Sequence, residues 1–435
     1  MINTTTQTWL YRAGLCALVL LPVAHLTSLG VMEMAGFVLL VASLSLFLTE
    51  ILADAPTALS RVRSIGVLPI LSYSVLTLIS AFVMLENGED QLAALRELKW
   101  VLYLFAFAYF FERYFTEAWA RYLPVLATLV ALTGALSLVQ FVYGLEYPRA
   151  ESVLERWGDY YRVTGLFNVP QSFAGNLGLA LFMLLGITLS QVNGGETLTA
   201  RLAGYRFVAV LLGALGLLLS LTRAAWLASA VVGVLALGRA RKRWGVVLLL
   251  MIAALAGLGS NSETIIGDRF SGEIDRNERS ILHREALWEA NWEIVRDYPW
   301  LGIGPWQNVR ELPTYYQRTQ PDDASYIGHA HNNVLQVLAS QGIFSALCYL
   351  GFCAFFLWAA YSLSQREMPG SLVHGLAWGS LYAQIYFHLL GMVDSPFFDQ
   401  EVKNMIVFIW ALTFALHQRA RRGVTLNLEN GQPRL

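Results

Sequence analysis

Charged side chains are scarce in this sequence: Asp, Glu, Lys and Arg make up 14% of its 435 residues, while apolar and aromatic residues make up 56%. The mean hydropathy is accordingly high, at +0.50. Soluble globular domains carry about 25% charged residues, so the composition excludes an ordinary soluble protein and indicates an integral membrane protein. A formal net charge of −1, with arginines that alternate with acids, gives no support for nucleic-acid binding.

Cysteine is nearly absent as well. Cys16, Cys348 and Cys353 all fall inside apolar runs, so no disulfide framework is expected. The sequence also has no internal repeat and no low-complexity tract, which favours a single membrane domain.

Apolar runs long enough to cross about 30 Å of hydrocarbon recur along almost the whole chain. They predict an all-α polytopic membrane protein with about 12 transmembrane helices. We interpret the first run as a retained helix and not as a cleaved signal peptide. The predicted spans are 12–31, 34–53, 65–84, 98–116, 122–144, 172–191, 205–222, 224–238, 244–259, 334–362, 372–393 and 401–418.

The distribution of basic residues predicts the orientation, because short connections rich in Lys and Arg favour the cytoplasm. Both termini and the even-numbered connections then lie in the cytoplasm. The predicted organisation is helices 1–9 in residues 1–259, a larger periplasmic loop at 260–333, helices 10–12 in 334–418 and a cytoplasmic tail at 419–435. The basic residues that decide this are Arg61, Arg63, Arg113, Arg121, Arg201, Arg206, Arg239, Arg241, Lys242, Arg243, Arg419, Arg421 and Arg422.

The large outer loop contains an amphipathic helical pattern over residues 278–297. Ile281, Trp288, Trp292 and Val295 recur at helical spacing on one side. Such a helix either lies on the membrane surface, with its tryptophans at headgroup depth, or packs within a small external cap.

Several arginines stand at predicted outer boundaries. Arg223 lies between two apolar runs, where its charge needs a partner or water. It either snorkels to lipid phosphates or belongs to an anion site, and Arg284 on the outer helix has the same two interpretations. Arg162 precedes a polar lip of Asn168, Pro170 and Gln171 on the same predicted side.

A titratable cluster, "HAHNNVLQ", precedes the tenth predicted span. His329 and His331 are candidate metal ligands together with Asp322, Asp323, His388 or Asp394, although no third ligand has a telling spacing. The alternative is a purely structural histidine that caps the helix. We favour His331 as a general base, since a histidine titrates near neutral pH and Asn332 and Gln336 share its end of the helix.

Four motifs in this order resemble the O-antigen ligase and O-antigen polymerase superfamily of bacterial envelope enzymes. They are "RVTGLFNVPQSFAG", "LTRAAW", "REALWEA…DYPWLGIGPW" and "HNNVLQVLASQG", within roughly residues 160–400. In family members, the third residue after the glycine that ends the last motif is usually Gly, Thr or Tyr. In this chain that residue is Ser345.

The resemblance implies a metal-independent, inverting glycosyltransferase of the multispanning, GT-C-like class in the bacterial inner membrane. Its catalytic histidine and two arginines correspond to His331, Arg223 and Arg284. The implied partners are an undecaprenyl-pyrophosphate-linked O-antigen donor, a lipid A-core acceptor and membrane lipids, with no cofactor, no metal and no nucleic acid. We expect the remaining candidates to bind substrate: Arg162, Asn332, His329, Gln336 and Asp394.

Three activities share this family site. Ligation to lipid A-core is favoured, because there is one moderate outer loop, little sequence follows the last span, and no arginine has a glycine eleven positions later as polymerase motifs do. The alternatives are an O-antigen polymerase and a protein O-oligosaccharyltransferase. A polytopic transporter, from a different class, should show repeated halves, which this sequence lacks.

Overall fold

The computed structural model describes residues 4–62, 67–145, 156–157, 160–193, 204–242, 245–246, 274–319 and 329–422. A short antiparallel pair, β1 (Arg156–Trp157) and β2 (Tyr160–Tyr161), accompanies the helices. The helices are α1 (Thr4–Thr27), α2 (Leu29–Val62), α3 (Val67–Met84), α4 (Gly88–Glu97), α5 (Lys99–Tyr143), α6 (Pro170–Asn193), α8 (Tyr205–Leu219), α9 (Arg223–Ala240), α12 (Ile274–Asp297), α13 (Asn308–Thr319), α14 (Asn333–Arg366), α15 (Leu372–Leu390) and α16 (Gln400–Arg421).

The chain is a helical, multi-pass membrane protein, as predicted. Within the described residues, seven helical segments are long and apolar enough to cross a bilayer, and α8 is a shorter apolar helix. The predicted spans 98–116 and 122–144 are the two arms of α5, which meet at non-helical dihedral angles at Tyr114 without a loop. The predicted span 244–259 lies almost wholly outside the described residues, so the count of twelve stays a prediction.

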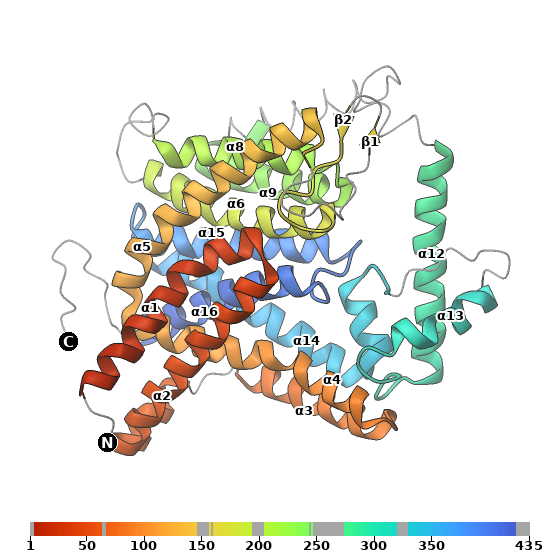
Figure 1. Cartoon of the computed structure of the whole chain (residues 1–435), viewed down its shortest axis with the longest axis horizontal. Coiled ribbons are helices and arrows are strands. Elements are labelled where there is room, and N and C mark those ends of the chain that lie inside the picture. The colour runs from red at the N-terminus through yellow and green to blue at the C-terminus, as the bar shows by residue number, and fades with distance from the viewer. Residues whose placement is uncertain are drawn as a thin grey trace.

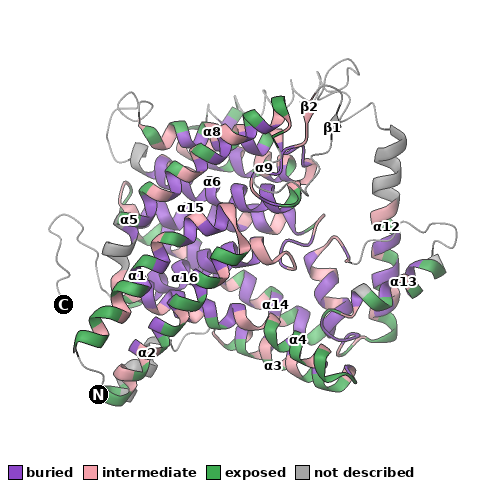
Figure 2. Ribbon diagram, viewed as in Figure 1, coloured by how far each residue is buried: buried purple, intermediate pink, exposed green. Residues whose placement is uncertain are grey.

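The outer helices expose apolar side chains, while the two last helices form the interior (Figures 1 and 2). On α2, Met34, Phe37, Val41, Leu44 and Leu48 are exposed at spacings of three and four residues, a stripe suited to lipid contact. In contrast, α15 and α16 are buried along nearly their whole length. They pack against each other and against α6 and α14.

Polar contacts join helix ends that are predicted to lie on the same side of the membrane. The ends predicted to be cytoplasmic are joined by Arg113 to Glu50, Arg422 to Glu112, and Ser190 to His374. The ends predicted to be external are joined by Gln140 to Gly165, Ser172 to Asp399, and His331 to Asp394. The side that faces the cytoplasm remains a prediction from the basic residues.

Helices α12 and α13 form a cap with its own small core. In Figure 1, α12 runs across the bundle at one end, roughly perpendicular to α14. Its buried stripe consists of Leu287, Ala290 and Ile294, whereas Trp292, on the predicted tryptophan side, is 48% exposed. Trp292 stays accessible because the residues that pack in the core of the cap lie on a neighbouring side of the helix, while Trp288 is half-buried.

Candidate functional site at the start of α14

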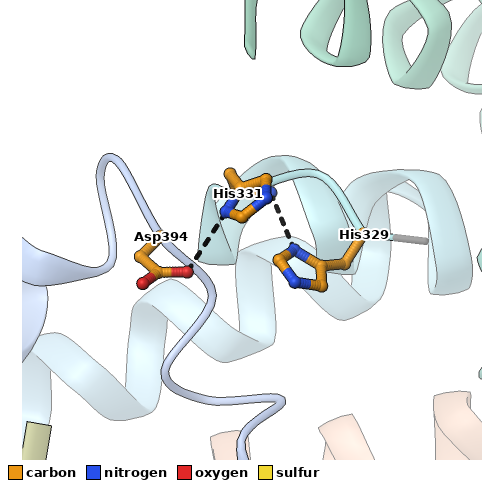
Figure 3. Close-up of side chains that lie close together, drawn as sticks. All are labelled: His329, His331 and Asp394. Carbon is orange, nitrogen blue, oxygen red and sulfur yellow. Dashed lines mark hydrogen bonds and ion pairs between the residues drawn. The ribbon is translucent and has the colours of Figure 1, made fainter. Parts of the chain in front are cut away.

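Three titratable side chains from two segments meet just before α14 begins (Figure 3). Nδ1 of His331 lies 3.3 Å from Oδ1 of Asp394, and both side chains are largely buried. The rings of His329 and His331 have centroids 4.0 Å apart, and the backbone N of His331 lies 3.4 Å from Nδ1 of His329. An imidazole held by a carboxylate through one ring nitrogen can accept a proton at the other.

The two asparagines that follow His331 attach the Asp394 segment to this site. Asn332 caps α14 by accepting from the backbone N of Leu335 at 3.0 Å, and its Nδ2 donates to the carbonyl of Met392 at 3.0 Å. The backbone N of Asn333 donates to the carbonyl of Gly391 at 2.8 Å. A Cβ on Gly391 would lie 2.3 Å from Nδ2 of Asn333, so this close approach requires glycine.

A further bond closes the attachment on its far side. Oδ1 of Asn333 accepts from the backbone N of Phe397 at 3.0 Å. Residues 391–397 are therefore fixed on both sides of Asp394, which places its carboxylate beside His331.

Electrostatics keep Asp394 ionised and His329 neutral. Burial opposes the charge on Asp394, but the hydrogen bond and the charge of His331 outweigh it, so the pKa of Asp394 lies below its usual value. Burial, with a smaller contribution from the neighbouring His331, lowers the pKa of His329 to about 4. Near neutral pH the site then contains one carboxylate charge and an uncharged His329.

The backbone at His331 is strained. Its φ of 46° lies in the left-handed region, which is uncommon for residues other than glycine. Buried Gln336 holds the preceding residue, because its Oε1 accepts from the backbone N of Ala330 at 2.7 Å. We predicted that Gln336 binds substrate; the structure places it beneath the loop as a support for the His331 backbone.

Helix α14 is broken at Gly342, whose φ of 78° and ψ of 179° interrupt the helix between the site and the long span. The turn 299–304 fills the break with backbone hydrogen bonds. Ile303 N donates to Ala339 O at 3.0 Å, and Gly304 N donates to Ser340 O at 3.0 Å. Ile343 N donates to Pro299 O at 2.9 Å. These bonds satisfy groups that the interrupted helix would otherwise leave unpaired.

Helix α3 holds both sides of this junction. Thr77 donates to Oε1 of Gln341 at 2.7 Å, just before the break. Ser80, one turn further on, donates to the carbonyl of Leu301 at 2.6 Å. The first turns of α14, and with them His331, therefore have a fixed position relative to the cap and to α3.

Beside the site, α12 and the start of α14 flank an open, mostly apolar groove of about 500 Å³. Trp288 and Trp292 line one wall and Asn332, Leu335 and Leu338 line the other. Arg284, which is half-buried, is four residues before Trp288 and shares its face of α12. The groove therefore connects the face of α12 that carries Arg284 with the residue next to His331.

Arg223 is the first residue of α9, directly after a tight junction in which Leu221 has a φ of 51°. Nε of Arg162 donates to the carbonyl of Ser220 in this junction at 3.2 Å. The structure thus places Arg162 beside the start of α9. No hydrogen bond or ion pair among the described residues joins Arg223 or Arg284 to His331.

The cluster of His329, His331 and Asp394 also meets the geometric requirement for a metal tripod. One candidate ligand atom from each lies within 4.8 Å of the others. The spatial proximity of Asp394 supplies the third ligand that sequence spacing did not reveal. Asp322 and Asp323 lie outside the described residues, and His388 is not part of this cluster.

These observations define a class: a multi-pass membrane protein with a histidine–carboxylate site at one end of its bundle, beneath a helical cap. Residues 208–350 match the family model described as O-Antigen ligase. This match supports membership of the O-antigen ligase superfamily. The matched region runs from α8 into α14 and includes Arg223, Arg284 and His331, while Arg162 and Asp394 lie outside it. No curated protein matches the sequence.

Sequence reasoning missed the residues that assemble the site. Asn333, Gly391 and Thr77 were not candidates, because each acts through a contact with a segment far away in the sequence. The doubled asparagine after His331 was a usable signal, since one asparagine suffices to cap a helix.

Proposed function

We propose that this protein is an O-antigen ligase, which transfers a glycan from undecaprenyl pyrophosphate to a sugar hydroxyl of lipid A-core. Membership of the superfamily supports a glycosyltransferase with polysaccharide and lipid-linked substrates. The observation that carries the mechanism is the pair of His331 and Asp394 at the entrance of α14. Ligation is preferred to polymerisation because the chain lacks an arginine with a glycine eleven positions later.

In the proposed step, Nε2 of His331 removes the proton of the acceptor hydroxyl as its oxygen attacks the anomeric carbon. Asp394 holds the Nδ1–H tautomer and stabilises the imidazolium that forms. The bond between the anomeric carbon and the pyrophosphate oxygen breaks, and the leaving group departs with the electron pair. Direct displacement inverts the anomeric carbon.

Negative charge develops on the departing pyrophosphate, and we assign its stabilisation to Arg223 and Arg284. Both stand at helix positions near the predicted outer boundary. Their forked donors match phosphate oxygens. The apolar groove along Trp288 and Trp292 supports this assignment, because it offers a lipid-linked substrate a lateral path to the site.

We further propose that the enzyme resides in the inner membrane with this site facing the periplasm and that it works without a metal. In a cysteine-free background, Asp275→Cys should react with a membrane-impermeant reagent in intact spheroplasts, whereas Arg241→Cys should not. The reverse pattern would refute the orientation. Full transfer activity in chelator is expected; loss in chelator and recovery with a divalent ion would establish the tripod as a metal centre.

The activity is tested by the glycolipid profile of a deletion strain. Loss of long-chain lipopolysaccharide with accumulation of full-length polymer on polyprenyl pyrophosphate is expected. Capping by single repeat units would indicate a polymerase. A normal lipopolysaccharide with undecorated envelope proteins would indicate a protein O-oligosaccharyltransferase.

A further inference from the structure

A second groove lies far from His331, between α2, α5 and α16. Its volume is about 250 Å³. Ser43, Ala106 and Phe414 form its buried floor, and Leu44 and Leu102, exposed by 46% and 54%, stand at its rim. The lining of α5 runs from Leu102 to Glu112, a length of about 15 Å in a helix.

The α2 wall belongs to a helix that exposes an apolar stripe, and Leu102 is exposed at the α5 rim, so the groove opens toward the hydrocarbon of the bilayer. An empty groove there would lose the dispersion contacts of its lining. A long, narrow, mainly apolar groove beside lipid is suited to a single extended hydrocarbon chain.

One end of the groove is strongly polar. Glu50 accepts from Tyr109 at 2.8 Å and from Nε of Arg113 at 2.7 Å. Nη1 of Arg422 donates to Glu112 at 2.6 Å. Nη1 of Arg419 donates to the carbonyl of Glu112 at 2.8 Å.

Among the described side chains of this cluster, three arginines meet two carboxylates, so the arginines outnumber the acids by one. The side chains of Arg113 and Arg422 remain 40% and 35% exposed, and each guanidinium has five donors. These are the helix ends predicted to lie in the cytoplasm, where the inner leaflet presents anionic headgroups.

We propose that this groove binds one acyl chain of an anionic phospholipid of the inner leaflet, with its phosphate at Arg113 and Arg422. The site is independent of the transfer reaction. It ties α2, α5 and α16 together at the end of the bundle opposite to His331.

The chain-binding half is tested on delipidated full-length protein by titration with phosphatidylglycerol, followed by native mass spectrometry and thermal unfolding. Leu102→Trp fills the groove and should abolish the bound lipid and the rise in Tm. Leu132→Trp is the matched control: Leu132 is exposed on the second arm of α5 and does not line the groove, so binding should persist. Wild-type binding by Leu102→Trp would overturn the proposal.

The headgroup half is tested with lipids of identical chains. Phosphatidylglycerol should bind more tightly than phosphatidylcholine. Arg422→Gln, which removes one positive charge from the cluster, should reduce this preference about fivefold, whereas Arg121→Gln, at an exposed position of α5, should not. Equal affinity for the two lipids, or equal binding of the deacylated glycerophosphate headgroup and of the intact lipid, would refute an anionic-lipid site.

Discussion

Replacement of Asp394 by asparagine tests the central pair of the site. The carboxylate lies 3.3 Å from Nδ1 of His331, longer than the 2.7–2.9 Å of a strong charge-assisted hydrogen bond. When the imidazolium forms, two unit charges about 4 Å apart at an effective dielectric of about 20 attract by about 4 kcal/mol. Both side chains keep some contact with solvent, so we expect about 1.4–4 kcal/mol to be lost, which is a rate reduction of about 10- to 10³-fold.

The assay is single-turnover transfer by purified protein in nanodiscs, with donor binding measured separately. Asp394→Asn should lower the transfer rate and leave donor affinity unchanged, because Asp394 faces the base and not the pyrophosphate. Asp399→Asn is the control: Asp399 caps α16 in the same segment, and asparagine is about as good a cap, so both the stability and the transfer rate should stay close to wild type.

The double variant His331→Ala/Asp394→Asn decides whether the two residues act as a unit. If they do, it should be no slower than His331→Ala alone. A wild-type rate for Asp394→Asn, or a full additional loss in the double variant, would refute the positioning of His331 by Asp394.

Three further predictions concern stability, measured by thermal unfolding. Gly342→Ala places a Cβ 2.0 Å from a turn carbonyl at a φ of 78° and should lower the free energy of unfolding by at least about 3 kcal/mol. Gly351→Ala is the control: its nearest contact is at 3.6 Å, so it should be neutral or stabilising. Equal Tm values for the two variants would show that the break is not required. Because the pKa of His329 is lowered to about 4 in the folded protein, the unfolded state binds the extra proton, so stability should fall as pH falls from about 6.5 to 4. His329→Gln should remove that part of the slope, and an unchanged slope would contradict it. Lys403→Met leaves Glu97 without its buried partner and should destabilise by about 2–3 kcal/mol, which Glu97→Gln should partly restore; no loss in the single variant would refute the role of the pair.

The apolar runs predicted most helices within a few residues, since each run needs a helix to satisfy its backbone in lipid. The apolar runs also predicted a loop between 116 and 122, but α5 instead bends at Tyr114. The length of an apolar run does not encode how two spans are joined. The polar positions of α16, among them Lys403 and Asn404, are explained by burial against protein on all sides, a context that one sequence does not reveal.

The candidate site was predicted in its composition but not in its geometry. His331 and Asp394 were both candidates, yet 62 residues separate them and only the bonds of Asn332 and Asn333 show why they meet. Arg223 and Arg284 stand at the helix positions expected of them, while their joint contact with pyrophosphate stays a prediction.

The junction at Gly342 has a consequence for how this enzyme can diverge. All three bonds between the turn 299–304 and α14 join main-chain atoms, so they impose no side-chain identity on Ile303, Ala339 or Ser340 beyond size. Substitutions of Ile303, Ala339 or Ser340 that keep their size therefore leave these bonds intact, whereas a Cβ added at Gly302 or Gly342 would collide with the opposing backbone at 2.3 and 2.0 Å. Lipid-facing residues of the span beyond Gly342 can then change without moving His331, so adaptation to a new membrane does not have to disturb the candidate site.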